Sequence, residues 1–508
     1  MALFLLPPAD DGPTPPAPPP VYLLAFFLKI TAGWSGVFAT SRTCARAVRQ
    51  ALGGLLCLGR RTLTGIIYTN GGEQSPIAAD YHLHSRAKWD AQELFAPIWE
   101  HALPLCQGNL IGVAMDDTKL HKTGRCIKQA FYQRDPMGPA FHTNLILGLR
   151  FLQGSLLVPD LSNSTKSTDP TNPTNPSNPS NPSADNSSER MATRALPIHF
   201  EEVSRVKRPN KKATPEQVAA WKAAAKKQNL STASVEAMQS IRGALDKAGG
   251  TDKTLIMAVD GSFCNKTCFG TVIDRTELLA RTRKNAVLCF RAETTPKGPQ
   301  SFYGKAKFTP ESVRQDEARP YQKTEVFYGG KMRKVRFKEV SGVYWQGGAK
   351  RRQLRLIVVA PTPYQKRKSG KIYYRQPAYL LTTDLTTPVA LLLQIYFDRW
   401  QIEVNHREEK DTLGIGQAQV WNEQSVPKQP VLAVAAYSAL MLAGLLAFGT
   451  KRTTAYEPLP AWRSTRQRRP SCRDMVNLLR QEATGAAAHL LPSGVKVSTE
   501  RIVRAAAA

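Results

Sequence analysis

The stretch Tyr396-Phe397-Asp398-Arg399-Trp400-Gln401-Ile402-Glu403, which continues to Lys410, decides how this sequence is interpreted. Four residues in it are separated by three, four and seven positions: Tyr396, Arg399, Glu403 and Lys410. An α-helix turns by about 100° per residue, so this spacing places the four side chains within roughly a 60° stripe of one helix. The stretch therefore predicts a helix with one face that carries a phenol, a guanidinium, a carboxylate and an ammonium.

The sequence before the stripe supports a helix, although a less specific explanation of the stripe exists. The helix is expected to begin near Pro388, with Thr387 as its N-terminal cap, and leucines at 391–393 give it an apolar side. A solvated face on which Arg399 pairs with Glu403 one turn away would have the same composition. The stripe therefore needs support from elsewhere in the chain.

Two apolar runs of strand length precede the stripe, and each of them ends in an acid. Residues 110–115 lead into Asp116-Asp117-Thr118, and residues 254–259 lead into Asp260-Gly261-Ser262. Short apolar runs bounded by polar residues are typical of buried strands. Asp384 also follows an apolar run, but we expect it to belong to the turn before the helix. Two strand-end aspartates and one helical glutamate are thus arranged in order along the chain.

The complete pattern Tyr-x2-Arg-x3-Glu-x6-Lys, preceded by two strand-end aspartates, resembles the signature of bacterial insertion-sequence DDE transposases. The resemblance covers about residues 108–448 and implies an α/β fold with an RNase H-like mixed-sheet core. It also implies three catalytic acids: Asp117, Asp260 and Glu403. Asp117 is preferred as the first acid because a threonine follows it, as in the family pattern. Asp116 is the alternative, because a strand pattern does not fix which of two neighbours faces the site.

The reaction that this family carries out explains why three carboxylates are needed. Phosphodiester cleavage requires an activated nucleophile and a stabilised leaving oxygen, and two divalent ions about 4 Å apart supply both. Mg²⁺, with Mn²⁺ as a substitute, prefers carboxylate oxygens, so Asp117, Asp260 and Glu403 are the expected metal ligands. The implied activity is cleavage of DNA at element ends, followed by strand transfer into target DNA. Two alternatives are an RNase H-like metal nuclease without transfer and a catalytically inactive DNA-binding protein derived from a transposase.

The charge balance predicts a polyanionic partner. Lysine and arginine number 69 against 40 aspartates and glutamates, a net charge of +29. Nucleic acid is the first candidate and a membrane surface is the competing one. Arg399 and Lys410 have no acceptor atom for a metal, so they are expected to contact DNA, together with Tyr396. Lys334 and Arg336 belong to a basic run that is also expected to contact DNA. The alternative is a solvated edge of a sheet, where lysines prevent aggregation and would give the same composition. We expect a homodimer in the DNA complex.

Composition and motif positions divide the chain into six parts. In order, these are a disordered proline-rich start (1–20), a helical region that is a candidate DNA-binding region (21–107), the first part of the core (108–260), a β-rich basic insertion (261–378), the second part of the core with the glutamate helix (379–448) and a basic tail (449–508). An Asn-Pro repeat at about 160–195 is expected to form a disordered interruption of the core. In the helical region, Gly59-Arg60-Arg61-Thr62 separates two helices, which a helix-turn-helix or an ordinary helical hairpin would explain equally.

One apolar segment, residues 431–448, is long enough to raise the question of a membrane span. It is rich in alanine and stands alone after the acidic motif, so we expect a buried helix that packs under that motif. No secretory signal is evident. The eight cysteines form no CxxC pair, which favours reduced structural thiols over a zinc site. Together these features predict a protein of the bacterial cytoplasm, associated with the nucleoid and without membrane contact.

Overall fold

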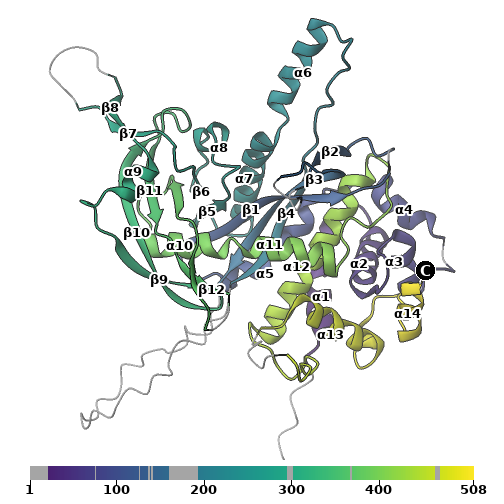
Figure 1. The fold of residues 1–508 in the computed structure, drawn as a ribbon. Helices are drawn as coiled ribbons and strands as arrows, with labels where there is room; N and C mark the ends of the chain where they lie inside the picture. The colour runs from purple at the N-terminus through teal and green to yellow at the C-terminus, as the bar shows by residue number, and fades with distance from the viewer. Residues whose placement is uncertain are drawn as a thin grey trace, which may run out of the picture.

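A large mixed sheet with helices on both sides forms the centre of the computed structural model (Figure 1). The structure describes residues 21–507, apart from 75, 125, 136–137, 139–140, 160–192, 294–300, 367–368 and 464–468. The proline-rich start and nearly all of the Asn-Pro repeat lie outside the described residues. The end of the predicted repeat segment is described, and its last two residues begin strand β4.

Twelve of the described strands form one sheet with the order β2-β3-β1-β5-β6-β14-β11-β10-β7-β8, while β4 pairs with β3 and β9 pairs with β10. Its strands are β1 Leu110–His121, β2 Phe131–Arg134, β3 Leu145–Val158, β4 Arg194–Glu202, β5 Thr254–Val259, β6 Thr276–Arg281, β7 Leu288–Arg291, β8 Tyr303–Phe308, β9 Gln322–Tyr328, β10 Lys331–Tyr344, β11 Gln353–Val359 and β14 Ala378–Thr382. A separate hairpin consists of β12 Pro363–Gln365 and β13 Ile372–Tyr374.

The two predicted acid-bearing strands are neighbours in this sheet. Strand β1 runs parallel to β5 and antiparallel to β3, and β5 in turn runs parallel to β6. Strand β5 is buried along almost its whole length, as its apolar run predicts. Parallel strands need a crossover connection. The chain between β4 and β5 contains α6 Pro215–Lys227, which projects from the body in Figure 1, and α7 Leu230–Lys247, which packs against β3 and β4.

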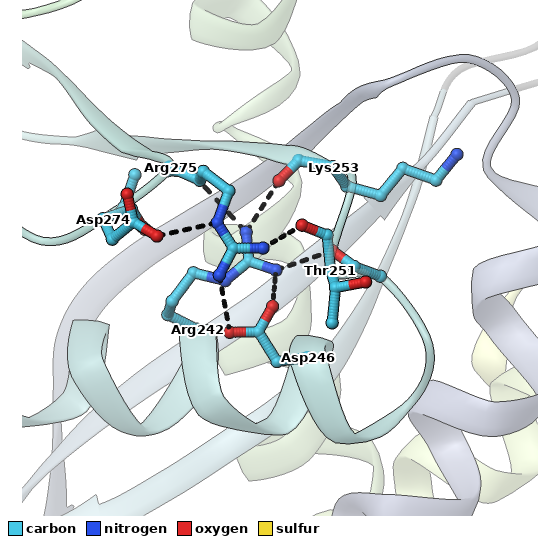
Figure 2. A network of polar contacts seen from close by, with 8 residues as sticks. Arg242, Asp246, Thr251, Lys253, Asp274 and Arg275 are labelled. Carbon is cyan, nitrogen blue, oxygen red and sulfur yellow. Dashed lines mark hydrogen bonds and ion pairs between the residues drawn. The ribbon is translucent and has the colours of Figure 1, made fainter.

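A polar network fixes the start of β5 against α7 (Figure 2). The side chain of Arg242 on α7 is only 5% exposed and donates to the carbonyl oxygens of Gly250 at 2.7 Å and Lys253 at 2.8 Å. It also donates to the carboxylate of Asp246, which Arg275 contacts from the β5–β6 connection at 3.3 Å. One buried guanidinium therefore satisfies the backbone of the turn that leads into β5.

Replacing Arg242 by methionine is expected to lower the free energy of unfolding by about 2–4 kcal/mol, because buried carbonyl groups would lose their donor. Chemical denaturation would measure the loss. Lys247→Ala is the matched control on the same helix, because the Lys247 side chain is 76% exposed and pairs with Glu93 at the surface. That change should cost at most about 0.5 kcal/mol. Equal losses for the two variants would contradict the role assigned to Arg242.

The predicted β-rich insertion continues the central sheet rather than forming a sheet of its own. Strands β9 and β10 form the hairpin predicted around Gly329 and Gly330, whose φ angles of 63° and 80° suit a tight turn. Strand β11 joins β10 to β14, and β14 pairs with β6. The short helices α8 Lys266–Gly270 and α9 Pro310–Gln315 lie in this half of the chain.

The remaining helices gather on one side of the sheet, where the purple N-terminal and yellow C-terminal segments meet (Figure 1). From the N-terminus these are α1 Leu23–Ala32, η1 Gly33–Gly36, α2 Ser41–Leu56, α3 Leu63–Thr69, α4 Ala78–Ser85, η2 Gln92–Phe95, α5 Ala96–Ala102 and η3 Leu103–Leu105. From the C-terminal part these are α12 Ser425–Phe448, α13 Cys472–Thr484, η5 Ala488–Leu490 and α14 Thr499–Ala507. The backbone amides of Leu23 and Leu24 donate to Glu482, so the start of α1 is bonded to α13.

Two expectations about these helices can be compared with the structure. Helix α12 is the one described helix long and apolar enough to cross a membrane, but 78% of its apolar stretch is buried against the sheet and other helices, as predicted for a core helix. In the region considered for a helix-turn-helix, α3 carries no basic residue, and four of its seven side chains are buried. The geometry of α2 and α3 thus resembles an ordinary packed hairpin.

Candidate active site

The register of β1 and β5 determines which acids face each other. Met115 pairs with Val259, so Asp116 and Asp260 are the next residues along two parallel chain segments. Strand β5 ends at Val259 as predicted, but β1 continues past Asp116 to His121 through its pairing with β3, so the prediction that the first acid ends its strand is wrong. Side chains alternate between the faces of a sheet. A Cβ atom at Gly112 would lie 3.3 Å from Ile395, and Ala114 packs against Ile402. Asp116, the next residue of that series, therefore faces the helices that carry Glu403.

These helices are α10 Val389–Asp398, α11 Gln401–Arg407 and the π-helical turn η4 Glu408–Thr412. The predicted continuous helix is therefore interrupted twice. At the first break, the amides of Ile402 and Glu403 bond three residues back, at 3.0 and 3.1 Å, which is a tightened 3₁₀ turn. The second break is the π-turn that contains Lys410. Such local changes of helical pitch often occur at functional sites.

The start of α10 differs in one detail from the prediction. Pro388 occupies the position before the helix, but the Thr387 side chain does not cap it. Instead, the hydroxyl of Thr387 donates to Asp384 at 2.6 Å, and Asp384 also accepts from the amides of Thr386 and Thr387. Asp384 is thus a turn residue, as expected. The Thr387 hydroxyl therefore bonds to Asp384 and not to the helix backbone, because short polar side chains readily bond to nearby groups of the same turn.

Arg399 lies between two of the acids. Its Nη2 atom is 3.3 Å from Oε1 of Glu403, and its Nη1 atom is 3.9 Å from Oδ2 of Asp116. The Nε and Nη1 atoms are buried and have no hydrogen-bond partner within the described part of the chain. This geometry matches the pairing of Arg399 with Glu403 that the sequence left as an alternative. It also leaves two donors of a buried cation available to an anion.

The local electrostatics follow from this crowding of acids. Burial raises the pKa of Asp116 to about 7; Asp260 raises it further, and Arg399 opposes the shift. Burial also raises the pKa of Glu403, again with Arg399 opposing the shift and Asp260 adding to it. Asp260 therefore acts on both Asp116 and Glu403, and we call these three residues the acid cluster.

Asp117 lies on the other face of β1. Its Oδ2 atom is 3.3 Å from Nε of Arg150 on β3. Burial raises the pKa of Asp117; Arg150, Lys119 and Lys410 oppose the shift, and Asp260 adds to it. That face is covered by α7, because Ile241 packs against Gly154 beside Met115. The structure thus places Asp116, the alternative first acid, with Asp260 and Glu403, and pairs the preferred Asp117 with an arginine instead.

The donors of the acid cluster suit a hard divalent cation, although they are not assembled around one. Among the described residues, no group of three His, Cys, Asp or Glu side chains is close enough to hold a metal ion. Arg399 supplies the positive charge between Asp116 and Glu403. Burial is the main cause of the raised pKa of Asp116, and Asp260 adds a smaller repulsion that a cation would relieve. Carboxylate oxygens are the ligands that Mg²⁺ prefers, so the donor types suit the metal, which stays a prediction.

The other predicted DNA-contacting residues lie in two places. Tyr396 packs under Arg399, whose guanidinium carbon is 6.0 Å from the ring centre. Lys410 lines a cavity of about 620 Å³ together with Lys119 and Lys122. Burial lowers the pKa of Lys122 to about 8, with Arg60 adding to the effect, and its Nζ donates to the carbonyl of Gly416 at 2.7 Å. Lys119 and Lys122 were not among the predicted DNA-contacting residues, although their positions just after the first acid could have pointed to them.

Lys334 and Arg336 are exposed, but they do not face the acid cluster. Their neighbours Val335 and Phe337 on β10 pack in the apolar cluster that includes Leu392 of α10. Alternation along the strand therefore directs Lys334 and Arg336 to the opposite face of the sheet. The structure brings together Asp116, Asp260, Glu403, Arg399 and Tyr396, but it does not bring these two basic residues to them.

A buried polar network supports the far side of α11. Asn405 bonds the hydroxyl of Ser155 at 3.0 Å and that of Tyr437 at 2.9 Å, and Tyr437 donates to Glu408 at 2.6 Å. Burial raises the pKa of Glu409 to about 8, so this carboxyl is largely protonated at neutral pH. The network joins β3, α11 and the core helix α12, and it fixes the orientation of Glu403 two residues earlier.

The comparisons with known proteins give the site no name. No model of a protein family matches this sequence, and no curated protein matches it significantly.

The raised pKa of Asp116 predicts a pH-dependent stability. Between its ordinary value of 3.8 and about 7, the folded protein holds a proton that the unfolded chain releases, so stability falls as pH rises through this window. Asp116→Asn is expected to raise the free energy of unfolding at pH 8 by about 2 kcal/mol, and the gain should vanish near pH 4. Denaturant titrations at both pH values measure this. Asp274→Asn, at an 83% exposed carboxylate, is the control, and an Asp116→Asn gain that is equal at both pH values would contradict the prediction.

Proposed function

We propose that this protein is a DDE transposase that cleaves DNA at element ends and transfers the strand into target DNA, with Mg²⁺ or Mn²⁺ as its cofactor. The observation that carries the proposal is the acid cluster. Asp116 within β1, Asp260 directly after the neighbouring parallel strand β5 and Glu403 on a helix across the same face are linked electrostatically, because Asp260 raises the pKa of both Asp116 and Glu403. This arrangement suits metal-dependent phosphodiester chemistry better than a structural role, because three acids gather around a single arginine that pairs with only two of them.

The sheet supports an RNase H-like core. Strands β4, β3 and β1 are consecutive antiparallel neighbours, and β5 and β6 follow as parallel strands on the other side of β1. Asp260 stands at the carboxyl end of the parallel strand β5, where sites of open α/β sheets are found, and Asp116 lies within β1, one residue beyond its last pair with β5. Strands β14, β11, β10, β7 and β8 extend the same sheet from β6 onward, and α10 packs against this part of the sheet through a second apolar cluster.

The roles of the residues follow from their positions. Asp116, Asp260 and Glu403 would hold the divalent ions, which when bound supply an activated nucleophile and a stabilised leaving oxygen. Arg399 balances the acids in the free protein and has buried donors that suit a phosphate oxygen. Lys410 and Lys119, which act electrostatically on Asp117, give a nearby cavity a positive lining for the DNA strand. We also propose that two protomers act together on paired DNA ends.

The test uses the purified protein and duplexes that carry the inverted repeats flanking its reading frame. With Mg²⁺ or Mn²⁺, we expect strand cleavage that leaves a 3′-hydroxyl at the repeat end, and joining of a pre-cut end to a second duplex. Cleavage without joining would favour the metal nuclease. Binding without cleavage in either metal would favour the inactive DNA-binding protein.

A further inference from the structure

A continuous series of contacts links three cations and three tyrosine rings. The six side chains come from the hairpins β9–β10 and β12–β13 and from the residue that follows β13. They are Tyr328, Arg333, Arg375, Tyr364, Tyr373 and Lys366, and we call them the cation–aromatic ladder. The guanidinium carbon of Arg375 lies 5.9 Å from the ring centre of Tyr328 and 5.4 Å from that of Tyr364. Arg333 lies 4.9 Å from the Tyr328 ring centre. The ladder continues outward through Tyr373, whose ring centre is 5.6 Å from that of Tyr364 and 5.0 Å from Nζ of Lys366.

The inner end of the ladder touches the helix of the acid cluster. The ring of Tyr328 stacks on Phe397 of α10, with ring centres 4.9 Å apart and planes 24° apart. Phe397 is two residues before Arg399, which contacts both Asp116 and Glu403. The ladder therefore begins on the α10 side of the sheet, in contrast to Lys334 and Arg336 on the opposite face.

The cations of the ladder carry charge that no carboxylate in the described residues neutralises. Neither Arg333, Arg375 nor Lys366 makes an ion pair there, and the side chains of Arg375 and Lys366 are exposed. A guanidinium attracted to the face of a ring keeps most of the N–H donors at its edge free. Stacking also restrains a long side chain, so less rotamer entropy is lost when it binds an anion. These are properties of a surface prepared for anionic groups.

Two rings of the ladder already have several partners. Tyr328 contacts Phe397 and both arginines, and Tyr364 contacts Arg375 and Tyr373. Bases that stack on free aromatic faces would therefore find less room on these two rings. The free donors instead suit phosphate oxygens, which makes the contact independent of sequence.

We propose that the cation–aromatic ladder is a docking surface for the phosphodiester backbone of the duplex DNA that flanks the cleaved bond. This proposal rests on the proposed function, which places the cleaved bond at the acid cluster. It adds a second DNA-contacting surface and says which part of the DNA that surface contacts. The ladder holds backbone phosphates along α10 while the acid cluster acts on the strand. It contributes affinity and no sequence preference.

The test measures binding of duplexes by fluorescence anisotropy across several salt concentrations. Arg375→Ala and Arg333→Ala should each weaken binding about three- to ten-fold, equally for unrelated sequences, and each should reduce the slope of log affinity against log salt by about 0.9. The matched control is Arg208→Ala. Arg208 is also exposed and lies 5.5 Å from an aromatic ring centre, that of Trp221, but on the segment that leads into α6. It should leave affinity and slope unchanged.

Two results would overturn this inference: unchanged slopes for both ladder variants, or an equal loss for Arg208→Ala. Thermal melting of each variant checks that these surface changes leave the fold intact. The cleavage assay separates this inference from the proposed function. If the parent protein cleaves repeat ends while the ladder variants bind normally, the ladder proposal alone fails. If the ladder variants lose affinity as expected and the parent protein cleaves nothing, the ladder is a DNA surface and the transposase proposal fails.

Discussion

Glu403→Gln is expected to reduce the rate of DNA strand cleavage by at least about 10³-fold, which corresponds to about 4 kcal/mol of lost transition-state stabilisation. Glutamine has the same shape and keeps an oxygen that can accept from Arg399, but it lacks the negative charge needed to hold a divalent ion. Binding of repeat-end duplexes should remain within about two-fold of the parent protein, because the basic surfaces are unchanged.

The measurement is single-turnover cleavage of a labelled repeat-end duplex in Mg²⁺, with anisotropy titrations of the same duplex. Glu423→Gln is the control. This carboxylate is 52% exposed and pairs with Lys128, which is not part of the acid cluster. Its removal should therefore leave cleavage unchanged. A Glu403→Gln protein that cleaves at the parent rate would remove Glu403 from the site.

The second large effect distinguishes two neighbouring acids. Asp116→Asn is expected to reduce cleavage by at least about 10³-fold, whereas Asp117→Asn should reduce it by no more than about ten-fold. The reason is the strand register, which directs Asp116 toward Asp260 and Glu403 and directs Asp117 toward Arg150. The two variants remove the same charge from adjacent positions, so each is the control of the other. The reverse order of effects would restore Asp117 as the first acid.

Much of the local structure could be predicted from the sequence. The apolar runs before Asp116 and Asp260 are strands, the segment around Glu403 is helical, and the hairpin at Gly329 and Gly330 is present. Each of these features has a short-range cause, such as periodicity, turn residues or chain length. The buried helix α12 was predictable for a similar reason, because its alanines and leucines leave no polar face.

The features that the sequence could not predict depend on contacts between distant segments. Which of Asp116 and Asp117 faces Glu403 depends on the pairing of β1 with β5, more than a hundred residues away. The 3₁₀ turn at Arg399 and the π-turn at Lys410 interrupt the regular helical period on either side of α11, which packs on β1 and β4. The alternation of side chains along β10 predicts that Lys334 and Arg336 share one face of the sheet. Only the assembled sheet shows that α10 packs on the opposite face.

The pairing of β3 with β4 has a consequence for how this chain can vary. Val158 and Arg194 are partners in the antiparallel ladder, so the fold brings together the two ends of the connection that carries the Asn-Pro repeat. When the fold itself holds the two ends of a connection together, the length of the connection affects stability mainly through the entropy lost on closing the loop. Doubling its length lowers the free energy of unfolding by only about 0.6 kcal/mol. The number of repeat units is thus free to drift during replication without selection against the fold. For the same reason, this hairpin is a suitable position for inserting a reporter domain into the intact protein.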